Sequence, residues 1–431
     1  MPRSSVGPFL SLALIVGAAH ASVADYPQPI VTTVVDTRHA SRPQWSPDGA
    51  WIVYDDYETP PPTGTIKIYR VRPDGTGKQA LTVARGEVPG DSGGPCYGAS
   101  ARWMLFQAEK AVHGPVPVGS TITDAGAGIY NDLMVLDHET GAITTLTDVG
   151  SGVGGEPIGG VLYPRFSPDG TRIAWGDFER TVPGRVFGDW RLMVADFVAT
   201  PTPHLANVRA YDPAGGASIY EVQGWTPDGS GILFAGTALA AQHEYTLDLC
   251  RFTPATGALA RLTRTSGLTG EPAVYEEQGV LSPRGDLLAV MSCAGHPVDY
   301  TRFFVAWLRT DLWIADPDGA LPRQATFYNI PGTPQHAEAA GRVMISEMGW
   351  DPSGLKLVAR VYFVRDEHDL ADDDSMVRIF DFTPGAGGTT ASTTTGSGTG
   401  GGGSGGGGGC GLGSGLSIAG VAALLLLWRL R

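Results

Sequence analysis

Apolar residues between about residue 30 and residue 385 fall in short runs bounded by polar turns, and the same order of runs recurs six times. In each unit an aromatic or apolar residue enters a turn, and an alternating run such as Trp51 to Tyr54 leaves it. A third apolar segment follows at Ile66 to Val71, Leu133 to Leu136, Leu192 to Ala195, Leu247 to Phe252, Leu312 to Ala315 and Val377 to Phe380. A fourth run, such as Ala142 to Thr147, completes most units. This pattern predicts four antiparallel strands per unit.

The turn between the first and second strands carries a repeated motif, in which an aromatic residue precedes Ser, Pro, Asp and Gly. The copies are Pro43 to Gly49, Pro95 to Ala101, Pro164 to Gly170, Trp225 to Gly229, Leu281 to Gly285 and Trp350 to Gly354, of which the second is degenerate. Ser, Pro, Asp and Gly fit the four positions of a type I turn. The copies lie 52 to 69 residues apart. Common propeller repeats span roughly 40 to 50 residues, so each unit carries insertions.

The sixth unit stops after its third strand, at Thr383 to Gly385, while an unassigned strand, Ile30 to Val35, precedes the first motif. We predict that this N-terminal strand completes the last unit and hides sheet edges that would otherwise pair with other chains. The predicted fold class is all-β. It is a six-bladed β-propeller with four antiparallel strands per blade, formed by residues 22–385.

On these residues the chain resembles the TolB-like family of six-bladed propellers, whose repeats carry the aromatic-Ser-Pro-Asp-Gly signature. The resemblance covers about Ile30 to Gly385. It implies a periplasmic or secreted binding module, although the same propeller also serves as the gate domain of some serine peptidases. Blade two departs from the signature, because Gly98-Ala99-Ser100 replaces Ser-Pro-Asp.

The composition agrees with a turn-rich β protein, because the chain has 61 Gly and 32 Pro but only 17% charged residues. Its formal net charge of −14 disfavours nucleic acid as a partner.

Both ends of the chain are predicted to lie outside the propeller. In residues 1–21, Arg3 precedes an apolar run and a small-residue pattern ends at Ala21, so we expect a cleaved signal peptide. Residues 386–415 are rich in Gly, Ser and Thr and should form a flexible linker. Residues 416–431 form a hydrophobic anchor or sorting helix with an Arg end, although the apolar part is shorter than the ~20 residues that span a bilayer comfortably.

The C-terminal order of Gly-rich spacer, Cys410, short hydrophobic helix and terminal Arg resembles bacterial sorting tags of the Gly-rich and myxobacterial types. This resemblance implies attachment to the cell envelope or surface. Processing or lipid attachment at Cys410 is the functional interpretation of that residue. We expect export by the general secretory route, with the C-terminal segment either kept in the membrane or removed.

A peptidase interpretation has little support in the sequence. No residues remain for a hydrolase domain, and no G-x-S-x-G motif occurs outside the low-complexity tail. The segment Gly90 to Pro95 looks like the nucleophile motif of chymotrypsin-like proteases, but His39 is the only His between the signal peptide and Ser92. We therefore expect Gly90 to Pro95 to be a Gly-rich loop between blades.

No cofactor is expected, and Ca²⁺ is the one ion considered, at the acidic run Asp366 to Asp369 and Asp372 to Asp374. These carboxylates lack EF-hand spacing, so a solvated loop is the simpler interpretation. The His residues show no zinc-ligand spacing. One disulfide is allowed in an exported protein. Cys250 and Cys293, in adjacent blades, are the expected pair, with buried free thiols as the alternative.

The two faces of the ring are predicted to differ. The turns that join strands one to two and three to four are short and define what we call the plain face. The opposite, long-loop face carries the connections Asp55 to Thr65, Gln107 to Asn131, Asp148 to Leu162, Asp177 to Trp190, Cys293 to Asp311, Thr326 to Ser346 and Arg365 to Ser375. Because binding residues concentrate in long loops on a rigid scaffold, the long-loop face is the predicted binding surface, with neutral drift of insertions as the alternative.

Glu221, Glu277 and Glu347 stand just before the inner-strand motifs of blades four to six, so we expect them to gather at the channel mouth, with Arg42 and Arg165 as counterweights. The leading interpretation is a non-enzymatic module that binds an envelope protein, a cationic peptide or a glycan. The alternative is a glycan lyase or hydrolase with its site at the channel mouth. A buried His/carboxylate cluster there would favour the enzyme, and a shallow charged rim would favour binding.

Overall fold

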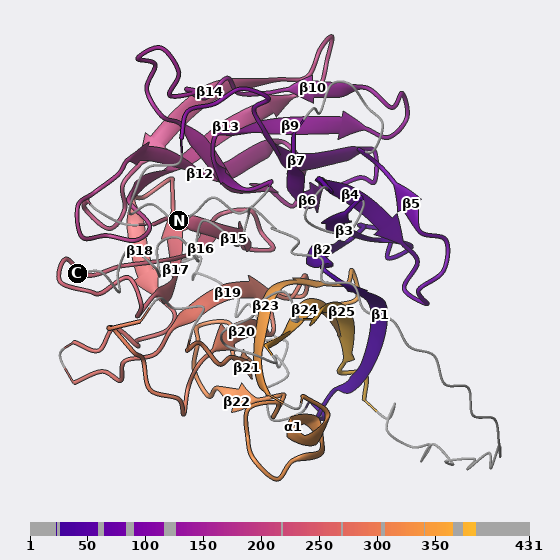
Figure 1. Ribbon diagram of the computed structural model, residues 1–431, viewed down its shortest axis with the longest axis vertical. Coiled ribbons are helices and arrows are strands. Elements are labelled where there is room, and N and C mark those ends of the chain that lie inside the picture. The colour runs from indigo at the N-terminus through magenta and orange to yellow at the C-terminus, as the bar shows by residue number, and fades with distance from the viewer. Residues whose placement is uncertain are drawn as a thin grey trace, which may run out of the picture.

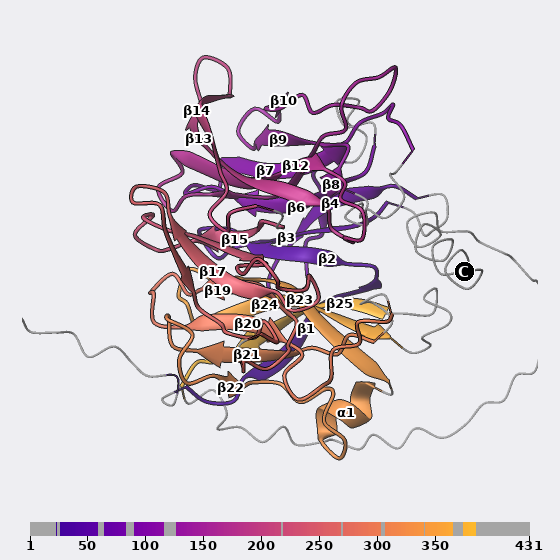
Figure 2. The ribbon, with the colours of Figure 1, turned by 90° about the vertical axis from the view of Figure 1, so that its left-hand side faces the viewer.

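The computed structural model describes residues 23, 26–58, 64–82, 90–115, 126–216, 219–268, 270–302, 307–339, 341–364 and 374–384. These residues form six antiparallel sheets arranged in a ring (Figure 1). The one α-helix in them is α1 (Pro334–Ala339), in the link between blades five and six, and it lies at one rim of the ring (Figure 2). The predicted fold class, an all-β six-bladed propeller, is confirmed.

Each blade is a four-strand meander, and the first strands of neighbouring blades contact one another around the ring. Blade one contains β2 (Ser41–Trp45), β3 (Ile52–Tyr57), β4 (Ile66–Val71) and β5 (Gln79–Ala80), and blade two contains β6 (Ser92–Tyr97), β7 (Trp103–Glu109), β9 (Asn131–Asp137) and β10 (Ile143–Thr145). Blade three contains β11 (Gly160–Phe166), β12 (Arg172–Arg180), β13 (Asp189–Val198) and β14 (His204–Tyr211), with β8 (Gly128–Ile129) added beside β11. Blade four contains β15 (Glu221–Trp225), β16 (Ile232–Gly236), β17 (Asp248–Thr253) and β18 (Ala258–Arg261). Blade five contains β19 (Glu276–Leu281), β20 (Leu288–Ser292), β21 (Asp311–Ala315) and β22 (Arg323–Gln324), and blade six contains β23 (Arg342–Trp350), β24 (Lys356–Val364), β25 (Asp374–Asp381) and β1 (Ile30–Arg38).

Pairing between strands from opposite ends of the described chain closes the ring. β1 runs antiparallel to β25, with Ile30 opposite Asp381 and Thr32 opposite Ile379. Figure 1 shows indigo β1 beside gold β25. The prediction that the N-terminal strand completes blade six is therefore confirmed, and the strand is longer than expected because it extends to Arg38.

The repeated turns on the plain face share one hydrogen-bond pattern. In the first copy the Gly49 amide donates to the Ser46 carbonyl at 2.9 Å, and the Ser46 hydroxyl donates to Asp48 at 2.5 Å. The closing glycines have φ between 66° and 71° and are Gly49, Gly170, Gly229, Gly285 and Gly354. A residue with a Cβ is strained at such φ, which explains why glycine recurs there.

The apolar core lies largely between neighbouring blades. One cluster around Ile52 joins blades six and one, a second around Phe106 joins blades one and two, and a third around Trp175 joins blades two and three. Burying an aliphatic or Phe side chain of this size contributes roughly 1.5 to 3 kcal/mol. Because each blade packs on the next, the ring holds the ends of its inner strands in fixed places.

Among the described residues, no helix is both long and apolar enough to cross a membrane. The predicted signal peptide, linker and C-terminal segment, including Cys410, lie outside the described residues.

Candidate functional site

Every inner strand has a register shift, typical of a β-bulge, that begins three or four residues before its aligned motif residue. The aligned motif residues are Trp45, Tyr97, Phe166, Trp225, Leu281 and Trp350. Three residues before the aligned motif residue, the backbone has positive φ in five blades, at Arg42, Gly94, Tyr163, Gln278 and Glu347. Four of these residues are not glycine, so their conformation is strained. Bulges re-aim nearby side chains, and strained conformations cluster at functional sites. The channel mouth on the long-loop face is therefore the first candidate site.

Glu221 and Glu277 form a carboxyl pair near the starts of β15 and β19. Glu221 is 2% exposed, and its carboxyl is hydrogen-bonded to the Glu277 carboxyl and to the Gln278 amide group. Burial, followed by the charge of Glu277 and the hydrogen bond to it, raises the pKa of Glu221 well above its usual range. Two carboxyls in such contact share a proton, so the pair can both donate and accept one.

Tyr275 lies beside this pair and is hydrogen-bonded to Glu277. Burial, followed by the charges of Glu277 and Glu221, raises the pKa of Tyr275 well above its usual value. The hydroxyl therefore keeps its proton and acts as a donor.

Glu347, on β23, has a separate set of partners. Its carboxylate accepts hydrogen bonds from the Ser346 hydroxyl at 2.5 Å and from the Tyr163 hydroxyl at 3.5 Å, and Arg360 Nη1 lies 3.6 Å away. The charge of Glu347 also contributes to the raised pKa of Glu221 and of Asp55. These carboxyls therefore lie within electrostatic range of one another.

Asp55 and Arg42 form a buried ion pair in blade one. Arg42 Nε lies 2.7 Å from Asp55 Oδ2, which also accepts a hydrogen bond from the Gly94 amide at 3.0 Å. Burial raises the pKa of Asp55 to about 6, although Arg42 and the Gly94 amide oppose that shift. Asp55 Oδ1 has no hydrogen-bond partner in the part of the chain that the structure describes.

The structure brings together four of the five residues that the sequence singled out, Glu221, Glu277, Glu347 and Arg42. Arg165 lies deeper along β11, where its guanidinium donates to the carbonyls of Gln223 and Pro164 at 3.3 and 3.1 Å and ties blade three to blade four.

These carboxyls are not an open acidic surface. Glu221 and Glu347 are 2% and 8% exposed. Arg42 and Arg360 offset part of their charge, and Tyr, Gln and Ser side chains supply their hydrogen bonds. A macromolecular partner on the long-loop face would therefore meet little of this charge directly.

A cavity of about 440 Å³ opens on the same face between blades five and six, and we call it the blade five–six cavity. Its walls come from the connections that the sequence marked as long, together with the end of β24. The lining residues are His296, Arg309, Asn329, Pro331, His336, Gly341, Arg342 and Val364. A second cavity, of about 150 Å³, lies between the long connections of blades three and four, with Arg185, Gln242, His243 and Glu244 in its lining.

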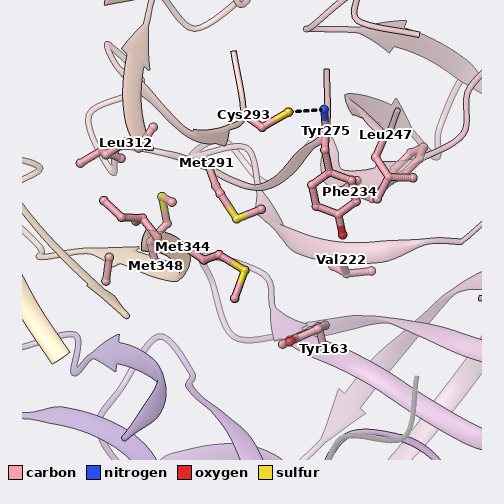
Figure 3. Close-up of a cluster of buried hydrophobic side chains, with 14 of the residues drawn as sticks. Tyr163, Val222, Phe234, Leu247, Tyr275, Met291, Cys293, Leu312, Met344 and Met348 are labelled. Carbon is pink, nitrogen blue, oxygen red and sulfur yellow. Dashed lines mark hydrogen bonds between the residues drawn. The ribbon is translucent and has the colours of Figure 1, made fainter. Parts of the chain in front are cut away.

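The expected disulfide between Cys250 and Cys293 is not formed, because both thiols are free and buried, as is that of Cys96. Cys250 lies on β17, whereas Cys293 follows β20 and its sulfur accepts a hydrogen bond from the Tyr275 amide at 3.1 Å (Figure 3). The pairing prediction was wrong because a disulfide requires closely approaching Cβ atoms, and membership of adjacent blades does not supply them.

Ser92 is a structural residue. It is fully buried, and its hydroxyl lies 2.9 Å from the Thr82 hydroxyl and 3.5 Å from the Ile66 carbonyl. Ser92 also begins β6, so the prediction that Gly90 to Pro95 is a loop between blades was wrong for its last four residues.

Within the described ranges, no group of three or more His, Cys, Asp or Glu side chains could hold a metal ion. The acidic run considered for Ca²⁺ falls outside those ranges except for Asp374, which begins β25 and is 6% exposed.

Sequence reasoning missed several residues of these sites. Tyr163 and Gln278 occupy the same repeat position as Glu347, so aligning the repeats could have found them. Aligning the repeats could not have found the basic residues of the blade five–six cavity, because three of them lie in connections whose length and sequence differ from blade to blade and the fourth begins β23. They are His296, Arg309, His336 and Arg342.

No protein-family model and no curated protein matches the chain. Among solved structures, a putative TolB from Agrobacterium tumefaciens is 15% identical, with a TM-score of 0.44 and coverage of 80% of this chain and 91% of that one. A puromycin hydrolase is 17% identical, with a TM-score of 0.42; the match covers 75% of this chain and 50% of the hydrolase. A hydrazine synthase from Kuenenia stuttgartiensis is 14% identical, with a TM-score of 0.41 and coverage of 81% and 79%. At these identities and TM-scores the similarities carry no argument about activity or partners.

Proposed function

We propose that this chain is an exported, envelope-attached propeller that acts as a non-enzymatic binding or scaffold module through its long-loop face. The observation that carries the proposal is the blade five–six cavity of about 440 Å³. Small-ligand sites typically occupy about 300 to 1,000 Å³. The cavity is walled by two long connections on a rigid ring, which is where binding sites usually form.

Export and envelope attachment are supported by the signal-peptide pattern of residues 1–21, by the hydrophobic segment 416–431 and by the resemblance of the repeats to TolB-like propellers. The proposed partner is an envelope protein or glycan. A cationic peptide at the carboxyls of the channel mouth is the remaining candidate.

Capture from envelope extracts, with the C-terminal tail removed, tests the binding role. Pro331→Trp places a bulky side chain at the cavity, and Ala255→Trp is the matched change in an exposed turn on the plain face. We expect wild type and Ala255→Trp to capture the same partner and Pro331→Trp to lose it. Equal retention by both variants would reject the long-loop face as the binding surface.

One observation favours an enzyme as the second candidate. The buried Glu221–Glu277 pair, with Tyr275 beside it, is the kind of carboxyl cluster that can act as a general acid. If the protein degrades glycans, Glu277→Gln should abolish release of fragments from envelope polysaccharide. Release that continues in Glu277→Gln, or none by wild type, would reject this candidate.

A further inference from the structure

The blade five–six cavity is lined by four basic side chains, although the whole chain carries a net charge of −14. His296 and Arg309 come from the connection within blade five, His336 comes from the link into blade six, and Arg342 begins β23. Arg309 and Arg342 are cationic at neutral pH, and cationic groups gathered in one concave site produce a local positive potential that concentrates anions. The cavity therefore has the opposite sign to the protein around it.

Arg342 is held in place at the cavity wall. It is 7% exposed, and its Nη1 donates a hydrogen bond to the Leu308 carbonyl at 3.0 Å. Arg309, in contrast, is exposed at the rim. One fixed and one exposed guanidinium on the same cavity suit a ligand that enters from solvent, because guanidinium groups bind carboxylate and phosphate oxygens in paired hydrogen bonds.

His296 supplies an independent sign that the cavity is built for a polar ligand. Its Nε2 is buried and has no hydrogen-bond partner among the residues that the structure describes. Burial lowers the pKa of His296, and the charge of Arg309 lowers it further, while Asp311 opposes both. A buried polar atom without a partner is costly, and a bound ligand relieves that cost.

The fourth basic residue is oriented by its backbone contact. His336 Nδ1 lies 2.9 Å from the Tyr328 carbonyl, which can only accept, so Nδ1 carries the proton. Asp311 and Glu338 are the acidic groups nearest in sequence to the lining residues, and both have partners. Asp311 accepts hydrogen bonds from the Thr326 hydroxyl at 2.8 Å and the Tyr328 amide at 2.9 Å, and Glu338 Oε1 lies 2.6 Å from Arg378 Nη2. The Asp311 carboxylate thus holds the loop that forms the cavity wall.

We propose that the blade five–six cavity binds the oxyanion group, a carboxylate or a phosphate, of a small envelope molecule between Arg309 and Arg342, with His296 and His336 as further hydrogen-bonding groups. This inference rests on the proposed function, since it names the ligand class for the same face. The volume limits the ligand to about the size of one acidic sugar or a similar small molecule.

Calorimetric titration of the full chain tests the proposal, with glucuronate and inorganic phosphate as the two probes. We expect saturable one-to-one binding of at least one of them. Arg309→Gln should weaken that binding about tenfold, because a charge-assisted contact is lost. Arg209→Gln removes a matched exposed arginine from β14 and should change binding less than about twofold.

Binding of glucuronate alone would identify a carboxylate ligand, and binding of phosphate alone a phosphate ligand. No saturable binding by wild type up to about 10 mM would overturn the proposal. Equal weakening by Arg209→Gln would also overturn it.

The titration needs no macromolecular partner, so its failure can be told apart from failure of the proposed function. If partner capture persists while both anions fail to bind, the proposed binding function is supported and the proposed anion site is rejected. If both anions bind while Pro331→Trp captures the same proteins as wild type, the proposed anion site is supported and the proposed binding function is rejected.

Discussion

The plain face and the long-loop face of this propeller place different residue types at positions of positive φ. On the plain face, residues at φ near +70° in the repeated turns are glycines such as Gly49 and Gly170. On the long-loop face, positive φ falls on residues such as Arg42, Tyr163 and Glu347, whose side chains make polar contacts. Strain is relieved where only a turn is needed and retained where a side chain makes polar contacts, which fits the binding role that we propose for the long-loop face.

The long-loop face itself divides into two regions of different charge. At the channel mouth, buried carboxyls contact one another, Arg42 and Arg360. Between blades five and six, basic groups line an open cavity. The net charge of the chain therefore does not give the sign of its most accessible site.

Removal of β1 should have the largest effect, because both faces depend on ring closure. A mature chain that begins at Asp36 leaves most of β25 unpaired and removes buried Val35. We expect a loss of several kcal/mol in the free energy of unfolding, or aggregation through the exposed edge. Thermal melting and size-exclusion chromatography measure this. Unchanged melting and solubility would contradict the closure by β1.

Asp55 should give the long-loop face a pH dependence opposite to that of the plain face. Its folded-state pKa of about 6 lies above the ordinary value of 3.8, so the stability it contributes is full below that ordinary value and is lost as pH rises through 6. Relative to Asp55→Asn, wild type should lose on the order of 3 kcal/mol of unfolding free energy between pH 4 and pH 7.

Asp169 provides the matched control on the plain face. Its hydrogen bond from Ser167 lowers its pKa to about 2, so its stabilising contribution is present above pH 4 and is lost as pH falls toward 2. Denaturant melts across pH should therefore show wild type losing stability relative to Asp55→Asn as pH rises from 4 to 7, and losing stability relative to Asp169→Asn as pH falls from 4 to 2. Parallel curves for the two variants would contradict the contrast between the faces.

Valine at a closing glycine tests the plain face alone. Gly49→Val and Gly170→Val should each cost roughly 1 to 3 kcal/mol in chemical denaturation, because a β-branched residue is strained at positive φ. Gly170 should be the more sensitive, since an added Cβ would lie 3.1 Å from the Ala99 Cβ, whereas at Gly49 the nearest atom, Pro352 Cδ, is 3.6 Å away. Ala101→Val in blade two is the milder control. Equal costs at all three positions would show that the repeat alignment is wrong.

The fold was predictable because the sequence features that specify it, the turns and the short apolar runs, are local and recur in each blade. The Ser46 to Gly49 turn and the spare strand at Ile30 can be recognised without knowing what packs against them. Glu221, Glu277 and Glu347 could also be grouped, since a repeat brings equivalent and adjacent positions to one end of the ring. Their burial could not be predicted, because it depends on bulges and on contacts with side chains from other strands, such as Tyr275.

The residues that line the blade five–six cavity could not be predicted, for a different reason. Arg309 and Arg342 are 33 residues apart, the first in a connection of variable length and the second at the start of β23, so no repeat register relates them. The disulfide prediction failed similarly, because blade membership places Cys250 and Cys293 near one interface without fixing where each points.

The smallest effect is expected from Glu221→Gln at the channel mouth. A protonated carboxyl and an amide offer the same kinds of donor and acceptor, so the glutamine can still accept from Gln278 and donate to Glu277. The free energy of unfolding at pH 7 should change by less than about 1 kcal/mol, and the variant should gain stability over wild type as pH rises, because the raised pKa of Glu221 penalises its ionised form. Glu347→Gln is the matched control. It should cost about 1 to 2 kcal/mol, because it weakens the ion pair with Arg360. Equal destabilisation by the two changes at pH 7 would show that Glu221 is ionised, and an acidic channel mouth that attracts a cationic partner would then become the better description of this region.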